Sequence, residues 1–153
     1  MSSLADRRSI LAVEDSDEDF EVLRLSLIAA GATNPLIRCA EAASALRLLD
    51  QQANENGGEK LPALVLLDLN LPDMDGRELL RRIRADPRLK TVPTIILSTS
   101  ANPRDVLNCY KSFANGYLVK PVGLEKFERM VRTLVEFWLR TAYLPASILE
   151  SGT

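Results

Sequence analysis

The order of apolar segments along the chain constrains its fold more than any other feature. Short apolar runs alternate with longer segments in which apolar residues recur at helical spacing. The short runs predict strands, which are expected at residues 10–13, 36–39, 64–67, 94–97 and 117–119. Helices are expected after each strand, and the last helix should run from Leu124 to about Ala142. This alternation predicts an α/β fold in which helices cover both faces of a parallel sheet.

The expected strand order follows from the handedness of the connections. Right-handed crossovers place five parallel strands in the doubly wound order 2-1-3-4-5, a flavodoxin-like topology. The carboxyl ends of strands one and three then form the topological switch point, where such sheets bind ligands. The 153 residues suffice for one domain with a core, expected at 9–142 between an N-terminal tail, 1–8, and a C-terminal extension, 143–153.

Charge and composition exclude several classes of function. The net charge is −2 and the pI is about 5.3, so a basic surface for nucleic acid is not expected. The apolar runs are far shorter than the roughly 20 residues that span a bilayer, and residues 1–9 lack the apolar stretch of a signal peptide. We therefore expect a cytoplasmic protein without membrane contact. Histidine is absent, which excludes a histidine triad, a histidine zinc site and a phosphohistidine within the chain.

Three acidic residues end two of the expected strands. Asp68 follows the run 64–67, and Glu14 and Asp15 follow the run 10–13. If these strands are neighbours, the three carboxylates converge on one crevice, where their mutual repulsion calls for a divalent cation such as Mg²⁺. This arrangement suits phosphoryl transfer to or from a carboxylate, and Asp68 is the predicted phosphoacceptor.

Capping of helices and turns is the alternative role for each of these acids. In the loop after Asp68, Asp73 and Asp75 are better placed for that role than Asp68 itself. Glu14 and Asp15 lie at a strand end and fit it poorly, so they are predicted to hold the cation. The acids that fit a helix opening well are Asp17, Glu18 and Asp19.

Two further residues are expected at this crevice. Asn70, two residues after Asp68, could offer its backbone carbonyl to the metal. Lys120 follows strand five, and a lysine there can stabilise a phosphoryl oxygen as a point charge. Pro121 comes next, and the Lys-Pro pair suggests a cis peptide bond that would aim the lysine inward. The alternative is a solvated surface lysine.

Hydroxyl groups end strand four. Ser98, Thr99 and Ser100 follow one another there, and a hydroxyl could bond a phosphoryl oxygen and change rotamer when phosphate arrives. Turn capping is the alternative, for which Ser100 or Asn102 is suited. Tyr117 begins strand five and could swing between exposed and buried states. Its alternative is an ordinary half-buried strand tyrosine.

The order of these motifs resembles the receiver domain of two-component response regulators. That pattern has an acidic pair after strand one, an aspartate after strand three, Ser or Thr after strand four and Lys-Pro after strand five, and the resemblance covers residues 9–140. It implies that a sensor histidine kinase or a histidine phosphotransfer protein donates phosphate to Asp68 with Mg²⁺. It also implies autodephosphorylation through an in-line water, with Ser98 at the phosphate and Thr99 as the second choice. Such a domain is a phosphoacceptor in signalling rather than a conventional enzyme.

Several segments are also similar to the single-domain regulators that pair with bacterial and cyanobacterial phytochromes. These segments are residues 13–16, 67–72, 98–100, 137–139 and 143–145. The similarity implies a phytochrome-type kinase as the partner and a homodimer formed through the last strand and helix. Because no DNA-binding effector domain is expected after the last helix, output should pass through protein contacts.

The last helix and the residues after it carry two apolar stripes. The first is Phe127, Val131, Leu134 and Trp138, and the second is Met130, Phe137 and Leu144. One stripe can cover the sheet, and the other would be exposed unless a partner covers it. We therefore expect a homodimer through helix four, strand five, helix five and the extension, with interface residues Tyr117, Met130, Phe137, Trp138 and Leu144. The alternative is a single wide buried face.

Two other functions compete with the receiver hypothesis. A haloacid-dehalogenase-like phosphatase also forms an aspartyl phosphate after a strand, but it needs a second aspartate two residues on as general acid. Asn70 stands at that position and disfavours the phosphatase. A constitutive adaptor would keep the fold without using the phosphosite, and the complete set of motifs argues against it.

Overall fold

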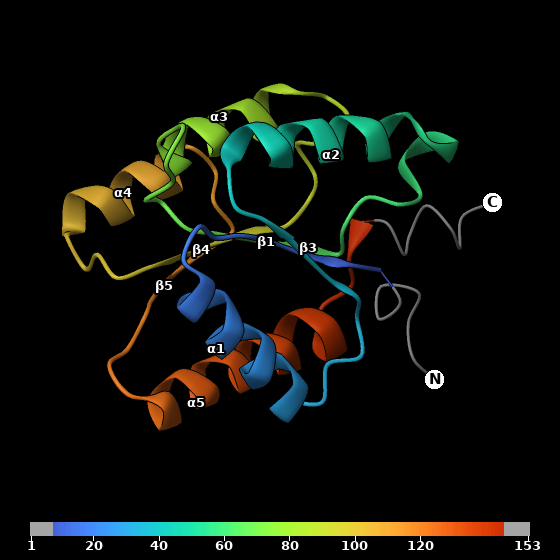
Figure 1. Cartoon of the computed structure of the whole chain (residues 1–153). Helices are drawn as coiled ribbons and strands as arrows, with labels where there is room; N and C mark the ends of the chain where they lie inside the picture. The colour runs from blue at the N-terminus through green and yellow to red at the C-terminus, as the bar shows by residue number, and fades with distance from the viewer. Residues whose placement is uncertain (1–7, 146–153) are drawn as a thin grey trace.

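The sheet has the predicted strand order. The computed structural model describes residues 8–145, in which five parallel strands lie in the order β2-β1-β3-β4-β5. The strands are β1 (Ile10–Val13), β2 (Leu36–Cys39), β3 (Leu64–Leu67), β4 (Thr94–Ser98) and β5 (Gly116–Val119). The first three have the predicted bounds, and β4 and β5 are each one residue longer. Figure 1 shows the sheet between two layers of helices.

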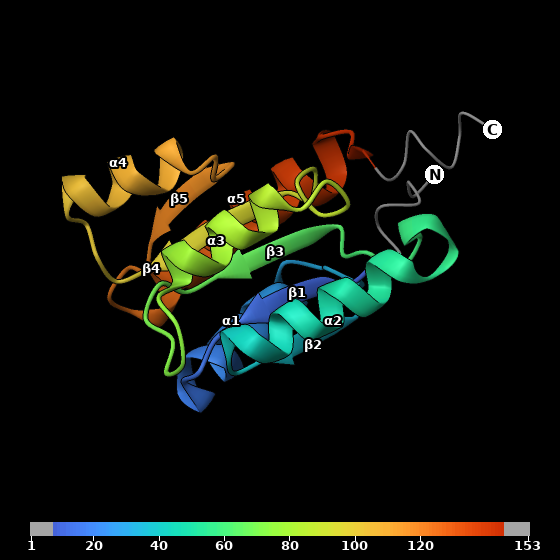
Figure 2. The same ribbon diagram turned by 90° about the horizontal axis from the view of Figure 1, so that it is seen from above.

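Between residues 8 and 145, five α-helices form these two layers. Helices α2 (Ala42–Asn54), α3 (Gly76–Ala85) and α4 (Pro103–Lys111) cover one face, and α1 (Asp17–Ala29) and α5 (Leu124–Val135) cover the other (Figures 1 and 2). A short 3₁₀ turn, η2 (Asn56–Gly58), follows α2. Within residues 8–145, every helix is too short or too polar to cross a bilayer.

The strands are buried on both faces, which explains their continuous apolar runs. In β1, Leu11 and Val13 face the core beneath α2 and α3, whereas Ile10 and Ala12 face the core beneath α1 and α5. All four residues are about 1% exposed. The sheet therefore separates two apolar cores, and polar residues of the strands' carboxyl ends gather at one edge.

The loop after β3 supplies the caps of two helices, as predicted for its acids. The Asp75 carboxylate accepts a hydrogen bond of 2.8 Å from the Arg77 amide and caps α3. The Asp73 carboxylate caps α2 instead, accepting 2.9 Å bonds from the amides of Ala42 and Ala43. Asp73 thereby ties the loop after β3 to a helix that lies 30 residues earlier in the chain.

The last helical segment ends where predicted, at about residue 142, but its type changes before that end. The α-helix ends at Val135, and the chain continues as a π-helical segment, η3 (Glu136–Thr141). The wider turn carries Arg140 to the end of α1, where its guanidinium donates to the carbonyls of Ala30 and Gly31 at 3.1 and 3.3 Å. A cation on the last carbonyls of a helix is stabilising, which is a physical reason for the altered turn.

Leu144 is not available to the dimer interface in which it was expected. It is 2% exposed and packs into the core beneath α1 and α5. The backbone becomes extended at Ala142, so the helical spacing does not continue to Leu144. Leu144, which lies in the expected C-terminal extension, thus packs against the core of the domain. Residues 1–7 of the expected tail and 146–153 of the extension lie outside the described residues.

Candidate functional site

The carboxyl ends of β1 and β3 lie side by side at the predicted switch point. Val13 pairs with Leu67 in register, and the Asp68 amide donates a 3.1 Å hydrogen bond to the Val13 carbonyl. The next residue of each strand is acidic, so Glu14 and Asp68 leave the sheet next to each other. Both are buried, at 6% and 8% exposure.

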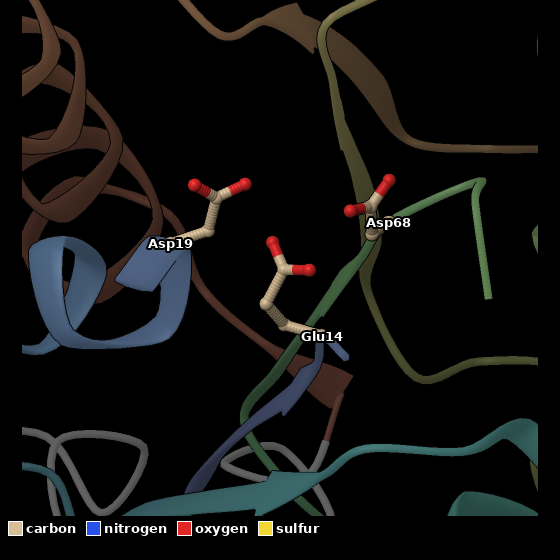
Figure 3. A group of neighbouring side chains, drawn as sticks. All are labelled: Glu14, Asp19 and Asp68. Carbon is tan, nitrogen blue, oxygen red and sulfur yellow. The ribbon is translucent and has the colours of Figure 1, made fainter. Parts of the chain in front are cut away.

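A third carboxylate joins them from the first turn of α1. Oxygens of Glu14, Asp19 and Asp68 all lie within 4.8 Å of one another. In Figure 3 the Glu14 carboxylate lies between those of Asp19 and Asp68. The Asp19 side chain is 47% exposed, so this group opens to solvent on the α1 side.

Lys120 binds all three acids. Its Nζ lies 2.6 Å from Glu14 Oε1, 2.9 Å from Asp19 Oδ2 and 3.2 Å from Asp68 Oδ2. Its side chain is 9% exposed, and its amide is fixed by a 2.7 Å bond to the Ser98 carbonyl. The Lys120–Pro121 peptide is trans, contrary to the expected cis bond. The lysine is nevertheless aimed inward, because β5 ends beside β4 at this edge.

The charges of this group perturb one another. The pKa of Glu14 is raised to about 7, chiefly because the group is buried; the hydrogen bond from Lys120 lowers this pKa, and the neighbouring Asp68 raises it. Burial lowers the pKa of Lys120, but hydrogen bonds to Glu14 and Asp19 and the charge of Asp68 outweigh it and hold that pKa well above its usual range. Lys120 therefore stays charged, and it offsets only one of the three carboxylates when all are ionised.

This donor set fits a hard divalent cation. Carboxylate oxygens are the ligands that Mg²⁺ prefers, and one or two of them suffice because the ion keeps several waters. Glu14 and Asp68 belong to the set, as predicted. Asp15 is exposed and lies outside the group of three, so its role as a ligand stays a prediction. The Asn70 amide donates to Asp68 Oδ1 at 3.1 Å, and metal binding by its carbonyl likewise stays a prediction.

Asp19 is the residue of this group that sequence reasoning missed. Its position in an acidic helix opening indicated a role with the helix dipole. Its backbone amide does donate a 3.2 Å hydrogen bond to Ser16 Oγ, the N-cap of α1. The available signal was topological. The first turn of a helix that begins directly after β1 must lie at the same sheet edge as the end of β1.

The hydroxyl residues after β4 form a connected set. Ser98 is fully buried, and its Oγ accepts a 3.1 Å bond from the Ser100 amide. The Tyr117 hydroxyl donates to the Ser100 carbonyl at 2.8 Å, and Ser100 Oγ donates to Asp105 at 2.6 Å. Thr99 is exposed and lines a hollow of about 290 Å³ beside Lys120. The structure thus links Ser98 to Tyr117 through one residue, Ser100.

Known proteins share both the sequence and this architecture. The family model of the response regulator receiver domain matches residues 10–132. Response regulator Rcp1 of Synechocystis is 39% identical over 138 residues, covering 90% of this chain and 93% of that protein. The structure of the phosphorylated cyanobacterial phytochrome response regulator RcpA has a TM-score of 0.82 at 36% identity, covering 91% of this chain and 99% of RcpA. The Mn²⁺-bound form of Rcp1 has a TM-score of 0.79 at 38% identity, covering 90% and 99%. From the shared sequence and fold, we conclude that this chain belongs to the response regulator receiver domain family.

Proposed function

We propose that the chain is a phytochrome-type response regulator that accepts a phosphoryl group on Asp68 from a histidine kinase or a histidine phosphotransfer protein. The observation that carries this proposal is the buried Asp68 carboxylate with Lys120 Nζ 3.2 Å from Oδ2. The similarity to RcpA, a cyanobacterial phytochrome response regulator, supports the phytochrome link.

In the proposed reaction, an Asp68 carboxylate oxygen forms a bond to the phosphorus of a phosphohistidine while the phosphorus–nitrogen bond breaks. Lys120 donates an N–H to a phosphoryl oxygen and offsets part of its added charge. Mg²⁺, held by Glu14 and Asp68 with Asp19 beside them, would supply the remaining positive charge. In autodephosphorylation, a water molecule attacks the phosphorus in line with the bond to Asp68. That bond breaks, which releases inorganic phosphate and restores the Asp68 carboxylate.

The proposed switch starts at Ser98. If the Ser98 hydroxyl turns to a phosphoryl oxygen, its bond with the Ser100 amide is lost. The Ser100 carbonyl accepts a hydrogen bond from the Tyr117 hydroxyl, so movement of Ser100 changes how the side chain of Tyr117, on β5, is held. The surface around Tyr117 then has two arrangements, one with the Ser98–Ser100 hydrogen bond and one without it. Phosphorylation shifts the balance between them only by the difference in free energy with which it stabilises each one.

We also propose a homodimer through β5 and α5. Met130 of α5 and Trp138 of η3 line an apolar hollow of about 420 Å³ beside β5, and Phe137, which also lines it, is 51% exposed. Phe137 packs edge-to-face on Trp138, with ring centroids 5.1 Å apart. Phe137→Ser should lower the apparent mass in sedimentation without changing the circular dichroism spectrum. A parent protein that sediments as a monomer at all concentrations would refute this dimer.

Labelling by acetyl phosphate tests the phosphoacceptor directly. We expect one phosphoryl group per chain by intact mass, dependent on Mg²⁺, absent in Asp68→Asn and slower in Lys120→Ala. Asp75→Asn is the matched control, because it changes an acid of the same loop and should keep the label. Label that persists in Asp68→Asn would refute the assignment, and steady turnover of a generic phosphate ester would favour a phosphatase.

A further inference from the structure

Arg38 reaches from the edge strand β2 to the loop that carries the acids of β1. Its Nε donates to the Glu14 carbonyl at 3.0 Å, and its Nη2 donates to the Asp15 carbonyl at 3.1 Å. Its Nη1 lies 2.7 Å from Asp17 Oδ1, at the start of α1. One guanidinium thus binds two successive backbone carbonyls and the helix that follows them.

The surroundings of Arg38 hold its guanidinium in place. Its Cζ lies 5.1 Å from the centroid of the Phe20 ring, and its side chain is only 25% exposed. Stacking on an aromatic ring and binding several acceptors in one plane are properties of arginine that lysine does not reproduce. The same backbone is held in the sheet by the Glu14 amide, which donates to the Cys39 carbonyl at 3.0 Å.

These contacts fix the direction in which the acids of the loop leave the backbone. With both carbonyls of residues 14 and 15 bound, the two peptide planes that follow Glu14 and Asp15 cannot rotate freely. The Glu14 carboxylate then points to Lys120 and Asp68 rather than to solvent. We propose that Arg38 is a positioning residue that holds the loop after β1 in the geometry needed to bind Mg²⁺, an inference that rests on the proposed function.

The direction in which Mg²⁺ affinity changes when Arg38 is removed distinguishes a positioning role from a purely electrostatic one. Arg38 is a cation close to an acidic site, so its charge alone opposes the binding of another cation. Removing it should then tighten Mg²⁺ binding if charge is all that it contributes. If Arg38 positions the loop, its removal should weaken Mg²⁺ binding, as happens when groups that orient metal ligands are lost.

The experiment compares Arg38→Met and Arg38→Lys with the parent in calorimetric titration with Mg²⁺. We expect both variants to bind about 10-fold more weakly, since lysine keeps the charge but not the planar fork. Arg24→Met is the matched control, because Arg24 on α1 pairs with Glu21 and its loss removes the same charge away from the loop. That control should leave the Mg²⁺ affinity unchanged.

Amide hydrogen exchange in the metal-free proteins gives a second readout. We expect faster exchange at Asp15 and Ser16 in both Arg38 variants, with unchanged exchange in β3, which also confirms that the sheet is folded. Mg²⁺ affinity that is equal to the parent's or tighter in Arg38→Met, or fully kept in Arg38→Lys, overturns the inference while leaving the proposed function intact. A parent that does not bind Mg²⁺ overturns both.

Discussion

Substitution of Gly76 by alanine should disturb Asp68, the proposed phosphoacceptor, through its backbone. Gly76 opens α3, and its amide donates to the Leu69 carbonyl at 2.8 Å. A Cβ at this position would lie 2.4 Å from the Asp68 carbonyl oxygen and 2.6 Å from Leu69 Cα. Both neighbours are backbone atoms, so relief requires α3 or the loop after β3 to move by about 1 Å relative to the other to reach ordinary contact.

Two opposing contributions determine how much Gly76→Ala changes the free energy of unfolding. Alanine in place of glycine gains about 0.5–1 kcal/mol where the backbone conformation suits it. Overpacking of a close contact costs about 1–3 kcal/mol. We expect the steric term to prevail and Gly76→Ala to lower the free energy of unfolding by about 1–2 kcal/mol. Because a misplacement of about 1 Å can slow a reaction as much as 100-fold, labelling of Asp68 should slow by about 10-fold or more.

Urea unfolding followed by the fluorescence of Trp138, the single tryptophan, measures the first effect, and acetyl phosphate labelling measures the second. Gly116→Ala is the control. Its new Cβ would meet only the tip of the Ile95 side chain at 3.2 Å, which can move, so stability should change by less than about 0.5 kcal/mol. If Gly76→Ala were as stable as the parent and were labelled at the parental rate, the close approach of α3 to the Asp68 and Leu69 backbone would not explain the glycine at position 76.

Three further predictions concern stability. Asp68→Asn should raise the free energy of unfolding in EDTA by about 1 kcal/mol, because it relieves the repulsion among the three carboxylates. It should also reduce the stabilisation that Mg²⁺ provides. A lower free energy of unfolding in EDTA would contradict this prediction. Asp73→Ala should lower the urea midpoint at pH 7, because the amides of Ala43 and Ala42 hold the pKa of Asp73 below its usual range. This cap contributes above the unfolded pKa and is lost as the pH falls through the folded pKa, so parent and variant should converge in acid. Arg140→Met should cost about 0.5 kcal/mol by the same assay, and an unchanged midpoint would show that its bonds to α1 contribute nothing.

Sequence patterns predicted the strands and their order because apolar runs and crossover handedness are local or general properties. They also predicted that Glu14, Asp68 and Lys120 meet, since each directly follows a strand of known position in the sheet. Asp19 was missed because its helical position suggested a local role, whereas the approach of α1 to the end of β1 is tertiary. Leu144 was misplaced because a regular spacing cannot reveal where a helix gives way to extended backbone.

The residues that hold the site differ in kind from those that carry its chemistry. Asp68 is fixed by a glycine on α3 that leaves space for its carbonyl, while the loop after β1 is tied by Arg38 on an edge strand. Asp73 ties the rest of the loop after β3 to α2. These contacts join backbone atoms far apart in the chain, and such partners leave no periodic or spacing pattern. The charged residues of such a receiver site can therefore be recognised in the sequence. The geometry of the site depends on contacts that only the folded structure shows.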